Sequence, residues 1–99
     1  MTVPSGGDLF SWHVLDPAGR RVGPGGAGAD PRRAMEELAR ALVRERPGSR
    51  GAVWAVRLVQ GRQGTYDYGG LVAQGFHDPE SGEVTVESPE PPRSIVLRP

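Results

Sequence analysis

The residues best suited to hold a metal ion are sparse in this chain. His13 and His77 are the only two histidines, they lie far apart, and there is no cysteine. Transition metals are usually held by closely spaced histidine and cysteine ligands. Asp16 and Asp78 could complete a carboxylate–imidazole site in principle, but no spacing favours one. We therefore expect no metal and no other cofactor.

Nucleophilic catalysis needs a nucleophile within reach of a base. None of the serines lies in the Gly-x-Ser-x-Gly turn that exposes a catalytic serine. Acid–base chemistry is conceivable at Asp67, between Tyr66 and Tyr68. Such a run in a strand is more typical of two aromatic rings that pack on one face, with a polar residue on the other. The sequence assigns no catalytic residue, and we expect a protein that is not an enzyme.

A glycine-rich segment, residues 23–28, precedes a predicted helix, where a phosphate group could bind the helix N-terminus. The segment lacks the Gly-Lys-Ser/Thr ending of a P-loop, and Pro24 interrupts the glycine spacing of a dinucleotide-binding turn. The side chain of Asp30 would also compete for the same N–H groups. We interpret residues 23–29 as a flexible connector.

The basic residues form the strongest functional signal. All of them are arginine, as is typical of GC-rich coding DNA, and the formal net charge of the chain is zero. Residues 20–62 nevertheless contain ten arginines against four acidic residues, a net charge of +6, whereas residues 63–99 carry −4. Such asymmetry is typical of a surface for nucleic acid or an acidic partner, and equally of two halves that pair with each other.

Helical spacing places three of these arginines on one polar face, and the others flank the start of the helix. Guanidinium groups suit phosphate and carboxylate ligands alike. The predicted binding residues are Arg20, Arg21, Arg32, Arg33, Arg40 and Arg44. Glu36 and Glu37 lie on the same face, and Glu36 with Arg40 is an i,i+4 pair of the kind found on a solvated helix. Both interpretations stay open.

The elements that would position these residues can be predicted from periodicity and turn chemistry. Residues 9–15 alternate like a half-buried strand, and 16–19 form an Asp-Pro-Ala-Gly turn into a short strand at 20–22. Asp30 and Pro31 favour a helix start, and Pro47 ends the helix near residue 46. Its apolar face contains Ala34, Met35, Leu38, Ala41 and Leu42.

The second half of the chain predicts further strands. Residues 52–60 form a central strand that is partly apolar on both faces, and 65–76 form a long strand with a bulge near Gly69 and Gly70. The turn at 78–82 repeats the chemistry of the first, and 83–87 closes a second hairpin. The apolar segment Ile95 to Leu97 could pair with a sheet edge.

These elements predict an α+β fold of order ββαβββ, an antiparallel sheet with one amphipathic helix packed on one face. The expected organisation is a flexible tail at 1–8, a single domain at 9–87, and a Pro-rich C-terminal tail at 88–99. With no apolar run long enough to span a bilayer and no signal peptide, a cytoplasmic location without membrane contact is expected.

Two functions remain open at this point. The first is a small non-catalytic binding module, regulatory in role, whose basic middle segment engages nucleic acid or an acidic protein partner. The second is a protein–protein adaptor or homodimer that uses the sheet face and the C-terminal tail.

Overall fold

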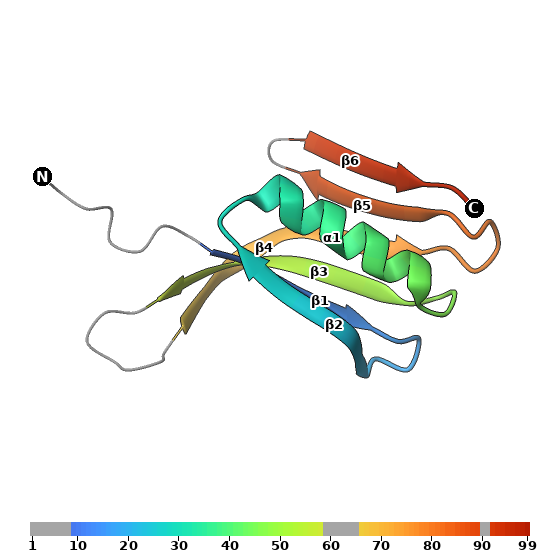
Figure 1. Ribbon diagram of the computed structural model, residues 1–99, viewed down its shortest axis with the longest axis horizontal. Coiled ribbons are helices and arrows are strands. Elements are labelled where there is room, and N and C mark those ends of the chain that lie inside the picture. Colours follow the sequence, from blue (N-terminus) through green and yellow to red (C-terminus); the bar gives the residue numbers. More distant parts are fainter. Residues whose placement is uncertain (1–8, 59–65, 90–91) are drawn as a thin grey trace, which may run out of the picture.

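In the computed structural model, which describes residues 9–58, 66–89 and 92–99, six strands form one sheet and a single helix packs against it (Figure 1). The strand order is β2-β1-β3-β4-β5-β6, and every neighbouring pair is antiparallel. The elements in chain order are β1 (Leu9–Leu15), β2 (Arg21–Gly28), α1 (Pro31–Arg44), β3 (Arg50–Leu58), β4 (Tyr66–His77), β5 (Val84–Pro89) and β6 (Pro92–Leu97). The predicted α+β class and its antiparallel sheet are confirmed.

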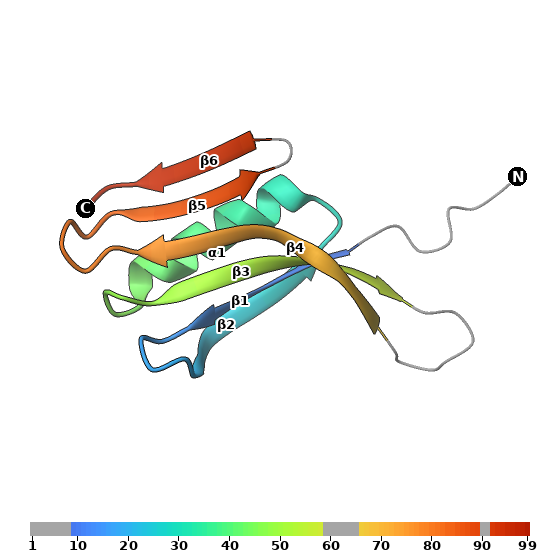
Figure 2. The same ribbon diagram turned by 180° about the vertical axis from the view of Figure 1, so that it is seen from behind.

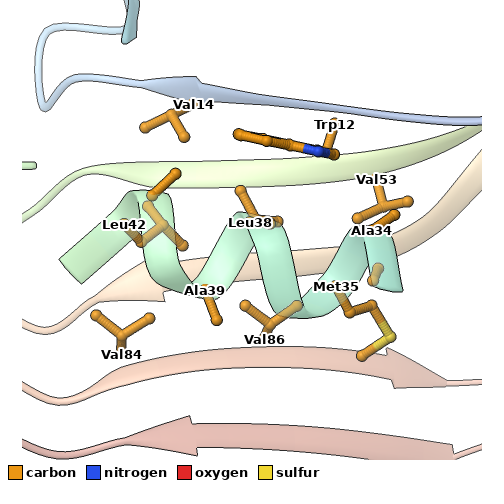
Figure 3. Close-up of a cluster of buried hydrophobic side chains, with 12 residues drawn as sticks. Trp12, Val14, Ala34, Met35, Leu38, Ala39, Leu42, Val53, Val84 and Val86 are labelled. Atoms are coloured by element: carbon orange, nitrogen blue, oxygen red, sulfur yellow. The ribbon is translucent and has the colours of Figure 1, made fainter. Parts of the chain in front are cut away.

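The helix lies across one face of the sheet and encloses the core (Figure 3). Its first turn begins as predicted, because the Asp30 side chain accepts a hydrogen bond from the backbone N–H of Arg32 and Pro31 needs no donor there. The helix ends at Arg44, two residues before the predicted position, where the N–H of Glu45 bonds the carbonyl of Leu42. The fully buried core side chains are Val14, Leu38, Ala39, Leu42, Val53, Val84 and Val86.

Two glycines let the helix approach the sheet closely. A Cβ atom at Gly51 would collide with the Leu38 side chain, and one at Gly75 would lie 2.6 Å from Cδ1 of Leu42. Any side chain at these positions would push the helix away from β3 and β4. The two leucines thus fill the space above the bare backbone of the two central strands.

The glycine-rich segment is a strand, so the predicted flexible connector at 23–29 is wrong. Residues 23–28 complete β2, which pairs with β1 at the edge of the sheet and bulges opposite His13. Gly25 and Gly26 pass so close to Trp12 that a Cβ on Gly26 would lie 2.7 Å from the indole nitrogen. Pro24 is tolerated because an edge strand has one set of N–H groups without a strand partner. Glycine here allows close approach of the backbone to a side chain, and composition alone does not distinguish this use from flexibility.

The remaining predicted elements are found with small changes of boundary. The long strand β4 has extra residues at Val72 and Gly69 relative to β3, which agrees with the predicted bulge. The apolar segment Ile95 to Leu97 lies in β6 and pairs with β5. The predicted N-terminal tail at 1–8 and the turn at 61–64 lie outside the described residues.

Candidate functional site

The structure divides the predicted arginine set between the two sides of the sheet. Four of its members lie on α1 and point away from the core, exposed to solvent: Arg32, Arg33, Arg40 and Arg44. Arg21 begins β2 and pairs with Leu15, while its neighbour Val22 packs into the core beneath the helix. Because side chains alternate along a strand, Arg21 projects from the side opposite the helix. Arg20 lies in the exposed turn before it.

The arginines on the helix are partly neutralised by their own neighbours. Arg32 pairs with Glu36 at 3.4 Å, and Arg33 pairs with Glu37 at 3.1 Å. The predicted pairing of Glu36 with Arg40 is not found within the described residues. Glu36 is paired instead with Arg32, one turn before it. Exposed pairs of this kind contribute roughly 0.3–0.5 kcal/mol each.

Glu37 has a second, structural partner. The indole N–H of Trp12 donates a hydrogen bond to Oε2 of Glu37 at 2.9 Å, while the guanidinium of Arg33 binds Oε1. One carboxylate therefore ties the helix to β1 and orients Arg33. Glu37 and Arg33, two polar side chains of the first two helical turns, are thus engaged in contacts within the fold.

On the other side of the sheet no described helix or strand covers the strands (Figure 2). That side carries exposed apolar side chains. Of the four large apolar residues exposed in the described chain, Leu71, Phe76 and Val96 lie here, at 42, 45 and 43%, and Val43 lies on the helix. We call this surface the open face. Its side chains are Leu15, Trp54, Leu71, Phe76 and Val96, with His13, Arg21, Arg50, Gln74, Thr85 and Glu87.

The middle of the open face is a shallow groove of about 780 Å³. It runs over β1, β3, β4 and β5, and its lining includes Trp54, Phe76, Arg50, His13 and Glu87. Desolvation by partial burial, and then the charge of Arg21, lower the pKa of His13. Both effects disfavour the protonated imidazole in a groove that also contains the guanidinium of Arg50 and the carboxylate of Glu87.

The described residues of the open face do not suggest catalysis. His13 on β1 and Glu87 on β5 are separated by two strands, too far for a hydrogen bond within one chain. Within residues 9–58, 66–89 and 92–99, no group of three or more His, Asp and Glu side chains is placed to hold a metal ion. The side chains of Tyr66, Asp67 and Tyr68 lie outside the described residues.

Two other polar groups lie buried at the end of the helix. The ring nitrogen Nδ1 of His77 is 2.8 Å from the carbonyl oxygen of Leu42, so this histidine caps the last turn of α1. The hydroxyl of Ser49 is fully buried and has no hydrogen-bond partner among the described residues. Neither opens onto the groove, and both belong to the packing of the helix against β3 and β4.

The open face is the candidate surface that sequence reasoning did not single out by residue. One available signal was the strand at 52–60, which is apolar on both faces although the chain contains only one predicted helix. One helix covers one face of a sheet, so apolar residues on the other face must remain uncovered. Phe76 and Val96 gave no separate signal for an exposed surface. In the sequence, each is an ordinary apolar residue of a strand with alternating side chains.

Comparison with known proteins finds no relative that would assign a role to this surface. No family model matches the chain, and neither the curated proteins nor the solved structures contain a match. The helix in the described part of the chain is not long and apolar enough to cross a membrane. The surface itself is therefore the basis for a proposed function.

Proposed function

We propose that this protein is a non-catalytic interaction module that binds a protein partner through the open face. The observation that carries the proposal is the gathering of Leu71, Phe76 and Val96, each more than two-fifths exposed, on one side of the sheet. Exposed apolar side chains gathered on one face of a small domain are typical of interaction sites, whereas single exposed apolar residues are common everywhere. Trp54 and Arg50, of residue types enriched in protein interfaces, lie in the same surface.

A nucleic-acid site is the less favoured function. Single-stranded nucleic acid is usually bound by a groove of one charge sign that carries stacked aromatic rings. The open face offers Phe76 and Trp54 for stacking, but only two arginines, with Glu87 among them. The four helical arginines lie on the opposite side of the sheet, where two of them are paired with glutamates. The net charge of zero provides little long-range attraction for phosphate.

Hydroxyl-radical footprinting tests which surface is covered in the protein's own environment. The tagged protein is labelled once in isolation, in dilute solution, and once in an extract of its source cells. We expect Phe76, Trp54 and Leu71 to be labelled less in the extract. Val43, which is 50% exposed on the helix, is the internal control and should be labelled equally in both.

Labelling of the open face in the extract as strong as that of the isolated monomer would refute the proposal. Protection confined to the helix, together with retention on single-stranded DNA or RNA at low ionic strength, would assign function to the arginines instead. In that case, replacing Arg33, Arg40 and Arg44 by alanine should weaken the retention and flatten its dependence on salt, since each lost phosphate contact releases fewer counterions.

A further inference from the structure

The open face has a regular layout that can be read from the strand register. Residues paired across neighbouring strands form rows that run across the sheet. The first row, from β2 to β6, contains Arg21, Leu15, Arg50, Phe76, Thr85 and Val96. The second row, from β1 to β6, contains His13, Ala52, Gln74, Glu87 and Ser94. In a third row, Trp54 is paired with Leu71.

Charge is divided between the two halves of this layout. The half built by β2, β1 and β3 carries the basic groups Arg21 and Arg50, together with His13. The half built by β4, β5 and β6 carries Glu87. Glu83, just before β5, is already paired with Arg98 at 3.2 Å. A surface that is basic on one half and acidic on the other is complementary to a copy of itself with the halves exchanged.

We propose that the partner of the open face is a second copy of this chain, packed face to face about a two-fold axis that runs parallel to the strands between β3 and β4. This inference rests on the proposed function and names its partner. Such an axis exchanges β3 with β4, β1 with β5 and β2 with β6. Glu87 of each copy then lies opposite His13 and near Arg21 of the other.

The same axis matches the apolar residues. Trp54 of one copy lies opposite Leu71 of the other, and Arg50 lies opposite Phe76, where a guanidinium can stack on an aromatic ring. The small side chain of Ala52 lies opposite Gln74. Twisted sheets pack with strands about 30° apart, a rotation that shifts these partners by only a few ångströms near the axis.

A two-fold axis at right angles to the strands fits less well. That axis would bring the second row of each copy against itself, so that Glu87 would lie opposite Glu87 in the partner. Like charges placed together in an interface are strongly unfavourable. The division of charge between halves thus selects the axis parallel to the strands.

The area of the open face suits a dimer. Six strands at a spacing of ~4.8 Å span about 29 Å, and strands of six to nine residues at ~3.3 Å per residue are about 20–30 Å long. The resulting area, about 600–850 Å² on each copy, is comparable with the ~600–1,000 Å² per partner of stable protein interfaces. The face is large enough for a specific homodimer without help from the helix.

Light scattering coupled to size-exclusion chromatography measures the mass directly. We expect the full-length wild type to have twice the 10.6 kDa mass of one chain, and to dissociate on dilution. Glu87→Arg makes the open face basic on both halves and should weaken the dimer about a hundredfold. Glu80→Arg, an identical change in the exposed turn before β5, is the matched control and should leave the mass unchanged.

An experiment that exchanges the charges distinguishes the proposed two-fold dimer from other modes of association. A second variant, Arg21→Glu with Arg50→Glu, makes the face acidic on both halves and should also be monomeric. Mixing it with the Glu87→Arg variant places residue 87 of each chain near an opposite charge at position 21 of the other, so we expect a heterodimer from two monomeric variants. Circular dichroism and thermal melting establish that each variant is folded.

A wild type that is monomeric at all concentrations would overturn the second-copy inference. If its open face were nevertheless protected in the extract, the proposed function would stand with a different protein as the partner. A dimer that survives Glu87→Arg, or two variants that do not associate on mixing, would overturn the two-fold geometry. Absence of footprint protection on the open face in the extract, compared with the isolated monomer, would overturn the proposed function itself, whatever the mass of the wild type.

Discussion

On the face of the sheet beneath the helix, Val14, Val53 and Val86 are fully buried, whereas on the open face Leu71 and Phe76 keep more than two-fifths of their surface exposed. Both faces carry apolar side chains along the same strands, and the open face carries polar and charged side chains as well. They differ in what lies against them: α1 covers one, and no described element covers the other. The covered face therefore stabilises the fold, and the open face is left available for the proposed binding.

Truncating one leucine at each face tests most directly whether the two faces contribute differently to stability. Leu42→Ala removes a fully buried side chain from the core and should cost about 2–5 kcal/mol of unfolding free energy. Leu71→Ala removes a side chain that is 42% exposed and should cost less than about 1 kcal/mol in dilute solution. Urea titrations of both variants measure the difference. Equal losses would mean that the two faces contribute alike to folding.

Two glycines, one beneath the helix and one beside open space, give the next largest effect. A Cβ at Gly51 would collide with Leu38, so Gly51→Ala should destabilise the fold by about 1–3 kcal/mol through displacement of the helix. A Cβ at Gly70 would point into open space, with nothing within 4 Å, so Gly70→Ala should be neutral or slightly stabilising. Thermal melting of the two variants tests this. A neutral Gly51→Ala would refute the close approach of helix and sheet.

The polar contact between α1 and β1 can be tested alone. Trp12→Phe keeps an aromatic ring in the core but removes the N–H that binds Glu37. The expected loss, including the smaller ring, is roughly 1–2 kcal/mol. Adding Glu37→Ala to both proteins completes a double-mutant cycle, and additive losses would show that the contact does not couple the helix to the strand.

The smallest expected effect concerns His13 on the open face. Its pKa is lowered in the folded chain, by desolvation first and by Arg21 second. Below the ordinary value of 6.5, the unfolded chain therefore binds more protons at this site than the folded chain does. Stability should fall as the pH drops from 6.5 through the lowered pKa, and His13→Gln should reduce that fall. Urea titrations between neutral and mildly acidic pH, in dilute solution, compare the two proteins.

Much of the fold could be predicted because local chemistry specifies it. The Asp30 cap, the repeated Asp-Pro turns and the alternation of Trp12 and Val14 each fix an element without reference to the rest of the chain. The strand of glycines at 23–28 could not be predicted in this way. It exists because Trp12 lies beneath it, and that contact joins residues remote in sequence.

The candidate site was harder to predict than the fold. The arginines are easy to find in the sequence because residue type alone gives their charge. The structure nevertheless separates them onto opposite sides of the sheet. Phe76 is exposed and Val53 is buried only because the helix packs on one face and not on the other. That choice depends on the sum of many contacts, among them the fit of Leu38 over Gly51 and Leu42 over Gly75.

The strand order has a consequence for how the chain folds. From β3 to β6 each strand pairs with the next along the chain, and β1 pairs likewise with β2. The pairing of β1 with β3 alone joins strands separated by another strand and the helix, so it must close a long loop before its contacts are gained. We expect the four-stranded meander to form early through short-range contacts, and the β1–β3 seam to form later and limit the folding rate. A circular permutant that joins the original termini and opens the chain between β2 and α1 would move this slow step to a different place in the sequence.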